Sequence, residues 1–304
     1  MGFVKFKIRR AQLHCIRTAL KHYENFFVLG PLTPPRLVPH IASLYAYARY
    51  ADDLADESDD PKNALHELDV WQQDLKDGLQ GDPHHPIILA LCNSVQKYQL
   101  PDKLLYDLLI AFKQDLSVTR FETFDLVRDY TRRSADPVGR LMLKIYGADD
   151  PELSELSDNI CTGLQLANFC QDIGEDALRD RIYIPLDECR RFGVDIVDIL
   201  DRKSSPKLEG LLRFQIVRAY RFLLAGLPLA ERLKGRLKIS VRLFTLGGLQ
   251  ILEILERDPL AALYRRMKLS PKQKMKAVLT SLRPLSRTYS ADSVKPQPVS
   301  TQKQ

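Results

Sequence analysis

A segment in the middle of the chain reads Gln165-Leu-Ala-Asn168-Phe-Cys-Gln171-Asp172-Ile-Gly-Glu175-Asp176. Its residue types predict a helix. One face of that helix carries four polar side chains at spacings of three, four and four residues: Gln165, Asn168, Asp172 and Asp176. The side chains around this face are apolar, so the helix is expected to be buried. Burying two carboxylates is costly unless a cation accompanies them. The segment therefore predicts an internal helix that holds a cation.

An earlier segment repeats the pattern. It reads Tyr45-Ala-Tyr-Ala-Arg49-Tyr-Ala-Asp52-Asp53-Leu-Ala-Asp56, and it places Tyr45, Asp52 and Asp56 on one helical face. Two such helices could face each other across a cavity. Mg²⁺ takes one or two carboxylates, keeps several waters and completes its octahedron with substrate phosphate. We therefore expect the two acidic faces to hold Mg²⁺, and the Mg²⁺ to hold a diphosphate.

Simpler explanations exist for the earlier segment. A pair of charges four residues apart is most often a solvated helix face, and Asp52 and Asp56 run directly into the acidic residues 57–60. They could mark only a helix end before an acidic loop. The later segment is harder to explain in this way, because Gln165 and Asn168 extend its polar face through apolar sequence.

Composition limits the classes of protein to consider. The chain has 304 residues, 45% of them hydrophobic, and a net charge of +6. No basic stripe interleaves with aromatic residues, which disfavours nucleic acid and favours an anionic ligand or membrane surface. The five cysteines are odd in number and lack C-x-x-C spacing, which predicts a reducing, cytoplasmic location. We find no signal peptide, no apolar run long enough to span a membrane and no sign of an obligate protein partner.

Helical periodicity without strand-like alternation predicts an all-α fold. We expect a single domain at residues 1–285, packed around a central cavity, and a disordered polar tail at 286–304. Residues 1–9 are basic and are either a solvated terminus or an amphipathic segment that touches anionic lipid. The expected helices are 11–27, 34–56, 61–79, 84–98, 101–117, 121–148 (kinked near Pro137), 152–180, 187–201, 207–233, 237–257 and 271–283.

Sequence motifs of other chemistries are absent. The chain has no G-x-S-x-G, no P-loop lysine motif, no H-E-x-x-H and no G-x-G-x-x-G. Its histidines do not have zinc-ligand spacing.

Three patterns together resemble the squalene/phytoene synthase family over residues 10–285: Tyr45-x-x-x-Arg49-x-x-Asp52-Asp53-x-x-Asp56, Gln165-x-x-Asn168-x-x-x-Asp172-x-x-x-Asp176 and Arg181-x-Tyr183-Ile-Pro185. The resemblance implies an isoprenoid-synthase-type helical bundle. The metal ligands it implies for Mg²⁺ are Asp52, Asp56, Asn168, Asp172 and Asp176. The residues it implies at the diphosphate or prenyl chain are His22, Tyr23, Glu24, Asn25, Tyr45, Arg49, Tyr130, Gln165, Arg181 and Arg265. Gln171 and Tyr183 are further candidate catalytic residues.

Within that family, several stretches are similar to the hydroxysqualene synthases of bacterial hopanoid biosynthesis, among them residues 22–26, 112–115, 132–140 and 168–172. Condensing members usually carry arginine where this chain has Gln171, often tyrosine where it has Gly248, and commonly glycine at Asp180. An arginine would be a fixed cation for a phosphate, whereas a glutamine can orient water. The resemblance thus implies Mg²⁺-dependent conversion of presqualene diphosphate and water to hydroxysqualene and diphosphate. Tyr45, Tyr130 and the phenylalanines could stabilise the intermediate carbocation through their ring faces.

Two alternatives stay open. One is head-to-head condensation of two farnesyl or geranylgeranyl diphosphates to presqualene diphosphate, squalene or phytoene. The other is a non-catalytic prenyl-lipid carrier or assembly factor, which would be free to lose acids that are complete here. Because the product is a lipid, peripheral contact with the inner face of the membrane is expected under either enzymatic reading.

Overall fold

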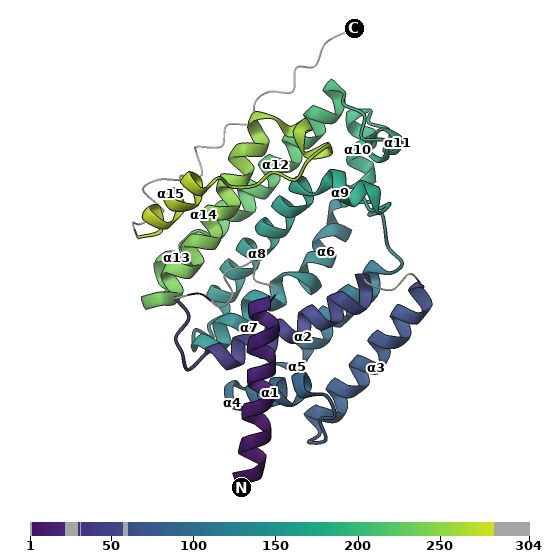
Figure 1. Ribbon diagram of the computed structural model, residues 1–304. Helices are drawn as coiled ribbons and strands as arrows, with labels where there is room; N and C mark the ends of the chain where they lie inside the picture. Colours follow the sequence, from purple (N-terminus) through teal and green to yellow (C-terminus); the bar gives the residue numbers. More distant parts are fainter. Residues whose placement is uncertain (1, 22–29, 31, 57–59, 283–304) are drawn as a thin grey trace. The chain divides into compact units, whose positions relative to one another are not determined.

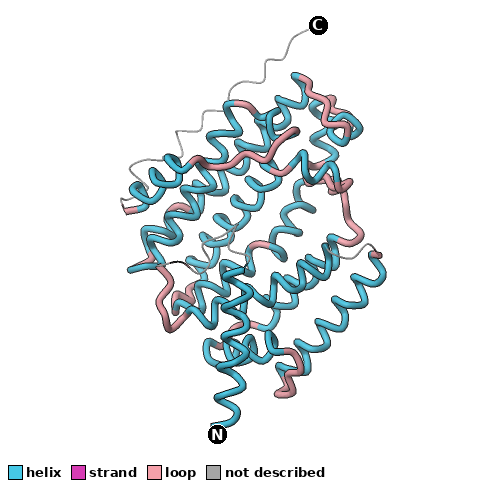
Figure 2. Tube along the Cα trace, viewed as in Figure 1, coloured by secondary structure: helices cyan, strands magenta, loops and turns pink. Residues whose placement is uncertain are grey.

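The computed structural model describes residues 2–21, 30, 32–56 and 60–282, and all of its regular elements are helices (Figures 1 and 2). The all-α prediction is confirmed. An isolated parallel bridge between Arg120 and Ile182 is the only β-type pairing among these residues. None of the described helices is long and apolar enough to cross a membrane.

The helices, in chain order, are α1 (Gly2–Lys21), α2 (Val38–Asp56), α3 (Pro61–Leu79), α4 (Pro86–Tyr98), α5 (Asp102–Asp115), α6 (Phe124–Ser134), α7 (Asp136–Tyr146), α8 (Pro151–Gln171), α9 (Ile173–Leu178), α10 (Leu186–Phe192), α11 (Ile196–Leu200), α12 (Pro206–Gly226), α13 (Pro228–Arg232), α14 (Gly235–Arg257), the 3₁₀ helix η1 (Pro259–Leu263) and α15 (Pro271–Ser281).

Four expected helices are each divided in two, and the first expected helix begins earlier than predicted. The breaks fall at Ala135, Asp172, Leu227 and residues 193–195. The first helix begins at Gly2 instead of residue 11, so the basic residues 2–9 belong to α1. Helix starts are better predicted, because Asp60, Ser205 and Ser270 each cap a helix whose first residue is proline.

The chain divides into two compact units. The first comprises residues 1–118 and 137–154, and the second comprises 119–136 and 155–304. The single domain at 1–285 around a central cavity stays a prediction. The expected tail at 286–304 lies outside the described residues.

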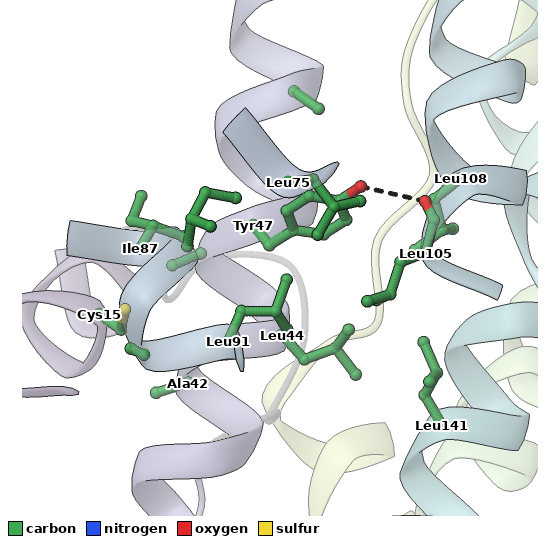
Figure 3. Packing of buried hydrophobic residues seen from close by; sticks show 14 of the residues in the cluster. Cys15, Ala42, Leu44, Tyr47, Leu75, Ile87, Leu91, Leu105, Leu108 and Leu141 are labelled. Atoms are coloured by element: carbon green, nitrogen blue, oxygen red, sulfur yellow. Dashed lines mark hydrogen bonds between the residues drawn. The ribbon is translucent and has the colours of Figure 1, made fainter. Parts of the chain in front are cut away.

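The core of the first unit forms where α1, α2 and α4 pack together (Figure 3). Cys15 and Tyr47 are fully buried in it. The Tyr47 hydroxyl donates a hydrogen bond of 3.0 Å to the Leu105 carbonyl, so its burial leaves no polar atom unpaired. All five cysteines are free thiols, and burial raises the pKa of Cys15 to about 12. The thiols therefore pack as small apolar groups.

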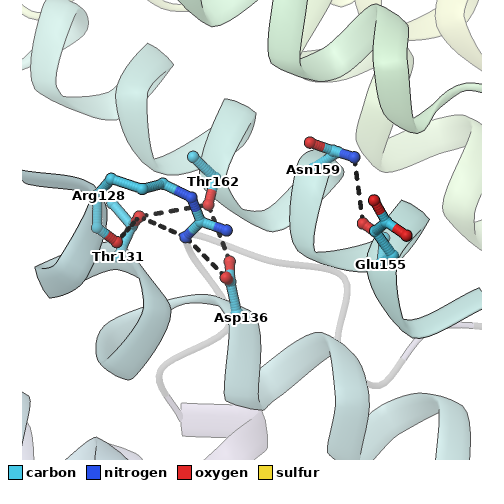
Figure 4. A network of polar contacts seen from close by, with 6 residues as sticks. All are labelled: Arg128, Thr131, Asp136, Glu155, Asn159 and Thr162. Atoms are coloured by element: carbon cyan, nitrogen blue, oxygen red, sulfur yellow. Dashed lines mark hydrogen bonds and ion pairs between the residues drawn. The ribbon is translucent and has the colours of Figure 1, made fainter. Parts of the chain in front are cut away.

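A buried polar network in the second unit holds the break between α6 and α7 (Figure 4). Asp136, only 2% exposed, accepts hydrogen bonds from Arg128 at 2.8 Å and from the Thr162 hydroxyl at 2.9 Å. Arg128 also donates to the Thr131 hydroxyl at 3.0 Å. Burial raises the pKa of Asp136 to about 6, and the buried carboxylate of Asp158 adds to the rise against the opposing effect of Arg128. The kink expected near Pro137 is thus a helix break stabilised by a carboxylate.

A close backbone contact joins α9 to η1. A Cβ added to Gly174 would lie 2.2 Å from the Leu263 carbonyl oxygen, so only glycine fits there. The contact matters for the site because the chain leaving η1 passes directly into residues 264–270. Position 174 therefore sets where that segment begins.

Gly174→Ala is expected to lower the free energy of unfolding by about 1–3 kcal/mol, because backbone must move to admit the methyl group. Gly247→Ala is the matched control, since a Cβ at that α14 position meets nothing within 4 Å. The control should be neutral or stabilising by up to about 1 kcal/mol. Denaturant unfolding of both variants checks the difference, and equal stabilities would contradict the close contact.

Asp136→Asn should become progressively more stable relative to the native chain as the pH rises from about 4 to about 6. The raised pKa means that folded Asp136 keeps its proton where the unfolded chain has lost it, so the native chain loses stability across this window. The relative gain is up to about 3 kcal/mol. Urea unfolding at several pH values measures it, and a difference independent of pH would refute the shifted pKa.

Candidate active site

Helix α2 presents the first acidic pattern on its accessible side. Ile41, Tyr47 and Ala51 are buried and fix the rotation of the helix. Arg49 and Asp52 lie on the other side, with side chains 34% and 42% exposed. The predicted residues of this helix therefore remain reachable by a ligand.

Arg49 links the acids of α2. Its Nη1 lies 3.2 Å from Asp52 Oδ2, and its Nη2 pairs with Asp53 Oδ1. Burial raises the pKa of the neighbouring Tyr45 phenol, with Asp52 and Asp53 adding to the rise against the opposing effect of Arg49. Asp56 is the last residue of α2 and is exposed. The structure thus joins Arg49 to Asp52 and Asp53, and Asp56 stands one turn beyond at the helix end.

The second acidic pattern spans the junction of α8 and α9. Asp172 occupies the break between them, yet its N–H donates to the Asn168 carbonyl and the Asp176 N–H donates to the Asp172 carbonyl, both at 2.8 Å. Helical hydrogen bonding therefore continues across the break and preserves the spacing of the pattern. Gln165 and Asn168, on α8, are half-buried.

The carboxylates of Asp172 and Asp176 both lie where their surroundings disfavour the charged form. Burial raises the pKa of Asp172 to about 6, against the opposing effect of Arg266. Burial and the nearby Asp172 raise the pKa of Asp176 to about 7, against the effects of Arg181 and Arg179. The pair would gain from an added cation.

A segment after η1 is fixed to this junction by two contacts. Arg266 Nε lies 2.8 Å from Asp172 Oδ1 and forms an ion pair with it. This carboxylate oxygen is buried, and the pair does not have the geometry of a hydrogen bond. The Gln171 amide donates a hydrogen bond to the Met267 carbonyl. The resemblance implied Arg265 at the diphosphate or prenyl chain, and this stays a prediction. Arg265 is exposed, and its neighbour Arg266 makes the contact with Asp172. The segment is not helical, so periodicity gave no signal to choose between the two arginines.

Aromatic rings line the side of the junction. Phe169 and Tyr183 stack with centroids 4.0 Å apart and planes 4° from parallel, and Tyr130 lies 5.8 Å from Tyr183. Phe121, 2% exposed, completes the group. Tyr130 and Tyr183 were predicted site residues and are brought together. Phe121 and Phe169 were not singled out among the phenylalanines, because Phe121 precedes α6 and Phe169 lies on the largely apolar α8, where an aromatic residue resembles ordinary core.

A small cavity of about 10 Å³ adjoins these rings, with Phe169, Cys170, Tyr183 and Gln215 in its lining. Its size is near that of one water molecule. Gln215 has little capacity left to bind one, because its amide donates to Glu188 at 2.7 Å and accepts from Arg218 at 2.9 Å. The cavity is therefore an apolar recess beside the acidic junction.

The carboxylates of the two acidic patterns suit Mg²⁺ better than a metal ion whose ligands all come from protein side chains. In the described part of the chain, no three His, Cys, Asp or Glu side chains lie close enough together to hold a metal ion. Each pattern offers one or two carboxylates, which is what Mg²⁺ takes when water and phosphate fill the other positions. The poorly compensated charge on Asp172 and Asp176 agrees with such a ligand. Another predicted group, His22 to Asn25, lies outside the described residues.

Comparison with known proteins gives the family. The model of the squalene/phytoene synthase family matches residues 19–273. The chain belongs to the squalene/phytoene synthase family. It is 35% identical to a hydroxysqualene synthase of Rhodopseudomonas palustris over 242 residues, which are 78% of this chain and 82% of the relative. It is also 31% identical to a phytoene synthase of Arthrospira platensis, over 68% of this chain and 72% of the relative.

Solved structures of the squalene/phytoene synthase family agree with the fold. The crystal structure of squalene synthase HpnC from Alicyclobacillus acidocaldarius superposes with a TM-score of 0.79 at 34% identity, covering 84% of this chain and 96% of that one. A dehydrosqualene synthase superposes with a TM-score of 0.82 at 19% identity, which speaks for the fold alone. The predicted isoprenoid-synthase fold and family are confirmed. Because relatives at similar identity bear different names, the reaction within the family is not decided by likeness.

Arg266→Gln is expected to slow diphosphate release from a prenyl diphosphate by about tenfold or more, because Asp172 loses its cation and the segment loses an anchor. The matched control is Arg257→Gln, which removes the same charge from an exposed residue at the end of α14 and should retain most of the rate. A phosphate-release assay distinguishes them. Equal losses in both variants would show that loss of one positive charge is enough, and would contradict a role for the contact with Asp172.

Proposed function

We propose that this enzyme converts presqualene diphosphate and water to hydroxysqualene and diphosphate, with Mg²⁺ as cofactor. The observation that carries the proposal is Gln171 within an otherwise complete acidic framework. The side chain of Gln171 is uncharged, and its amide donates a hydrogen bond to the Met267 carbonyl. Position 171 therefore offers no positive charge to a second diphosphate. Condensation must hold two diphosphates, whereas hydration of presqualene diphosphate holds one. The 35% identity to a hydroxysqualene synthase supports the same choice.

The chain's own groups have defined tasks in this reaction. Asp52, Asp56, Asn168, Asp172 and Asp176 would hold Mg²⁺, which when bound supplies Lewis acidity to the leaving diphosphate. We assign to Arg49, Arg181 and Arg266 the task of stabilising the negative charge that develops on that diphosphate. This charge arises as the C–O bond breaks and its electron pair leaves with the diphosphate. Arg266 would exchange Asp172 for a phosphate oxygen.

The aromatic group accounts for the second half of the reaction. The ring faces of Tyr130, Phe169 and Tyr183 would stabilise the carbocation left behind, as π faces do for other cations. A water oxygen then donates an electron pair to the cation, and the proton it loses passes to the departing diphosphate or to solvent. The apolar lining of the recess beside Phe169 would help to keep bulk water from this wall.

Head-to-head condensation of two prenyl diphosphates is the second candidate. It is favoured by the 31% identity to a phytoene synthase. A non-catalytic prenyl-lipid carrier is disfavoured, since both acidic patterns are complete. For either enzymatic function the substrate and product are lipids, and we also propose peripheral contact with a membrane.

Product analysis tests the proposal. Purified protein is incubated with Mg²⁺ in H₂¹⁸O, with presqualene diphosphate or with farnesyl diphosphate, and without NADPH. The proposal predicts ¹⁸O-labelled hydroxysqualene from presqualene diphosphate by mass spectrometry. Presqualene diphosphate formed from farnesyl diphosphate, without hydroxysqualene, would establish condensation instead. Absence of diphosphate release from both substrates would favour the carrier.

Asp172→Asn should reduce the rate of diphosphate release by about a hundredfold or more, because a neutral amide is a poor Mg²⁺ ligand. Asp187→Asn, an exposed acid at the start of α10, is the control and should retain nearly the full rate. Steady-state assays over a range of Mg²⁺ concentrations make the comparison. An Asp172→Asn enzyme with nearly full activity would remove this residue from the metal site.

A further inference from the structure

Helix α15 has a fixed inner face. It packs against α14 through Ala277 and Ser281, which are 5% and 0% exposed. Arg242 of α14 also donates a hydrogen bond of 3.2 Å to the Ser281 carbonyl. A capping box between Ser270 and Gln273 defines where the helix starts. The rotation of α15 about its axis is therefore set by contacts on one side.

The opposite face of α15 is apolar and open. Met275, Val278, Leu279 and Leu282 follow the i, i+3, i+4, i+7 spacing of a single helical face. They are 59%, 45%, 59% and 63% exposed. A surface helix normally turns polar residues outward, so an outward apolar face marks a site of interaction.

The charges around this face select its partner. Lys272, Lys274 and Lys276 are exposed on the same helix, and residues 259–282 contain no Asp or Glu. An apolar face flanked by lysines on an acid-free helix has the pattern of a helix that lies in the headgroup region of a bilayer. Anionic lipid complements both parts of the pattern, since its charge attracts the lysines and its acyl chains receive the apolar side chains.

Helix α15 follows closely in the chain after the segment that contacts Asp172 and Gln171 at the junction of α8 and α9. Pro271 follows Arg266 by five residues, so their Cα atoms are at most about 18 Å apart even when the chain is extended. The segment between them is anchored to Asp172 and Gln171. A membrane bound at α15 would thus lie close to where a prenyl diphosphate is expected to bind.

We propose that the face of α15 formed by Met275, Val278, Leu279 and Leu282, with its flanking lysines, docks the enzyme on an anionic lipid surface. This proposal rests on the membrane contact proposed under the function and names the surface that would make it. Vesicle binding without substrate tests it separately from the reaction, so that failure of one leaves the other standing.

The experiment is co-sedimentation of the full chain with sucrose-loaded vesicles of phosphatidylcholine, with and without about one third phosphatidylglycerol. The native chain should sediment with the anionic vesicles, and less so at high salt. Met275→Gln/Leu279→Gln should reduce the partition coefficient by about tenfold or more, because two side chains no longer enter the acyl region. Lys272→Gln/Lys274→Gln/Lys276→Gln should cause a comparable loss on anionic vesicles only.

The control is Leu126→Gln/Val197→Gln, which changes two apolar residues that are 49% and 53% exposed on α6 and α11. It should sediment like the native chain, and thermal melting should show all variants folded. Failure of the native chain to bind anionic vesicles would overturn the proposal. Equal binding by Met275→Gln/Leu279→Gln would also overturn it, as would light scattering that shows this face joining two copies of the chain instead.

Discussion

The structure depends most on how the negative charge of the half-buried carboxylates of Asp172 and Asp176 is compensated. Burial raises the pKa of each, Asp172 adds to the rise for Asp176, and Glu175 adds to both. Of the surrounding cations, Arg266 contacts Asp172 directly at 2.8 Å. A carboxylate pair whose pKa values stay raised despite the arginines nearby is a costly feature for a fold to keep without a ligand. We propose that a divalent cation and a diphosphate compensate it in the working enzyme.

The same pair explains the local architecture. Asp172 lies at the break between α8 and α9, and backbone hydrogen bonds of 2.8 Å on either side of it keep the four-residue spacing. Gly174 then allows η1 to approach the backbone of α9, which delivers residues 264–270 to the junction. Gln171 and Arg266 hold that segment in place. Aromatic rings, one acidic pair and one arginine-bearing segment thus converge within the second unit.

Sequence reasoning succeeded where periodicity carries the information. The expected helices at 34–56 and 61–79 correspond to α2 and α3, and their polar faces follow from spacing alone. It failed where tertiary contacts decide. Nothing in the local sequence showed that a carboxylate network would divide residues 121–148 into α6 and α7, or that Arg266 would pair with Asp172. The face of α15 was missed for a similar reason, since a pattern cannot say which side of a helix its neighbours cover.

The central proposal is that Asp172 and Asp176 are ligands of a metal–diphosphate complex. A crystal structure with Mn²⁺ and a non-hydrolysable prenyl thiodiphosphate tests it most directly, because manganese is located by its anomalous scattering. The account predicts manganese peaks about 2.0–2.3 Å from carboxylate oxygens of both residues, with Arg266 on a phosphate oxygen. A bound analogue with no metal at either carboxylate would contradict it.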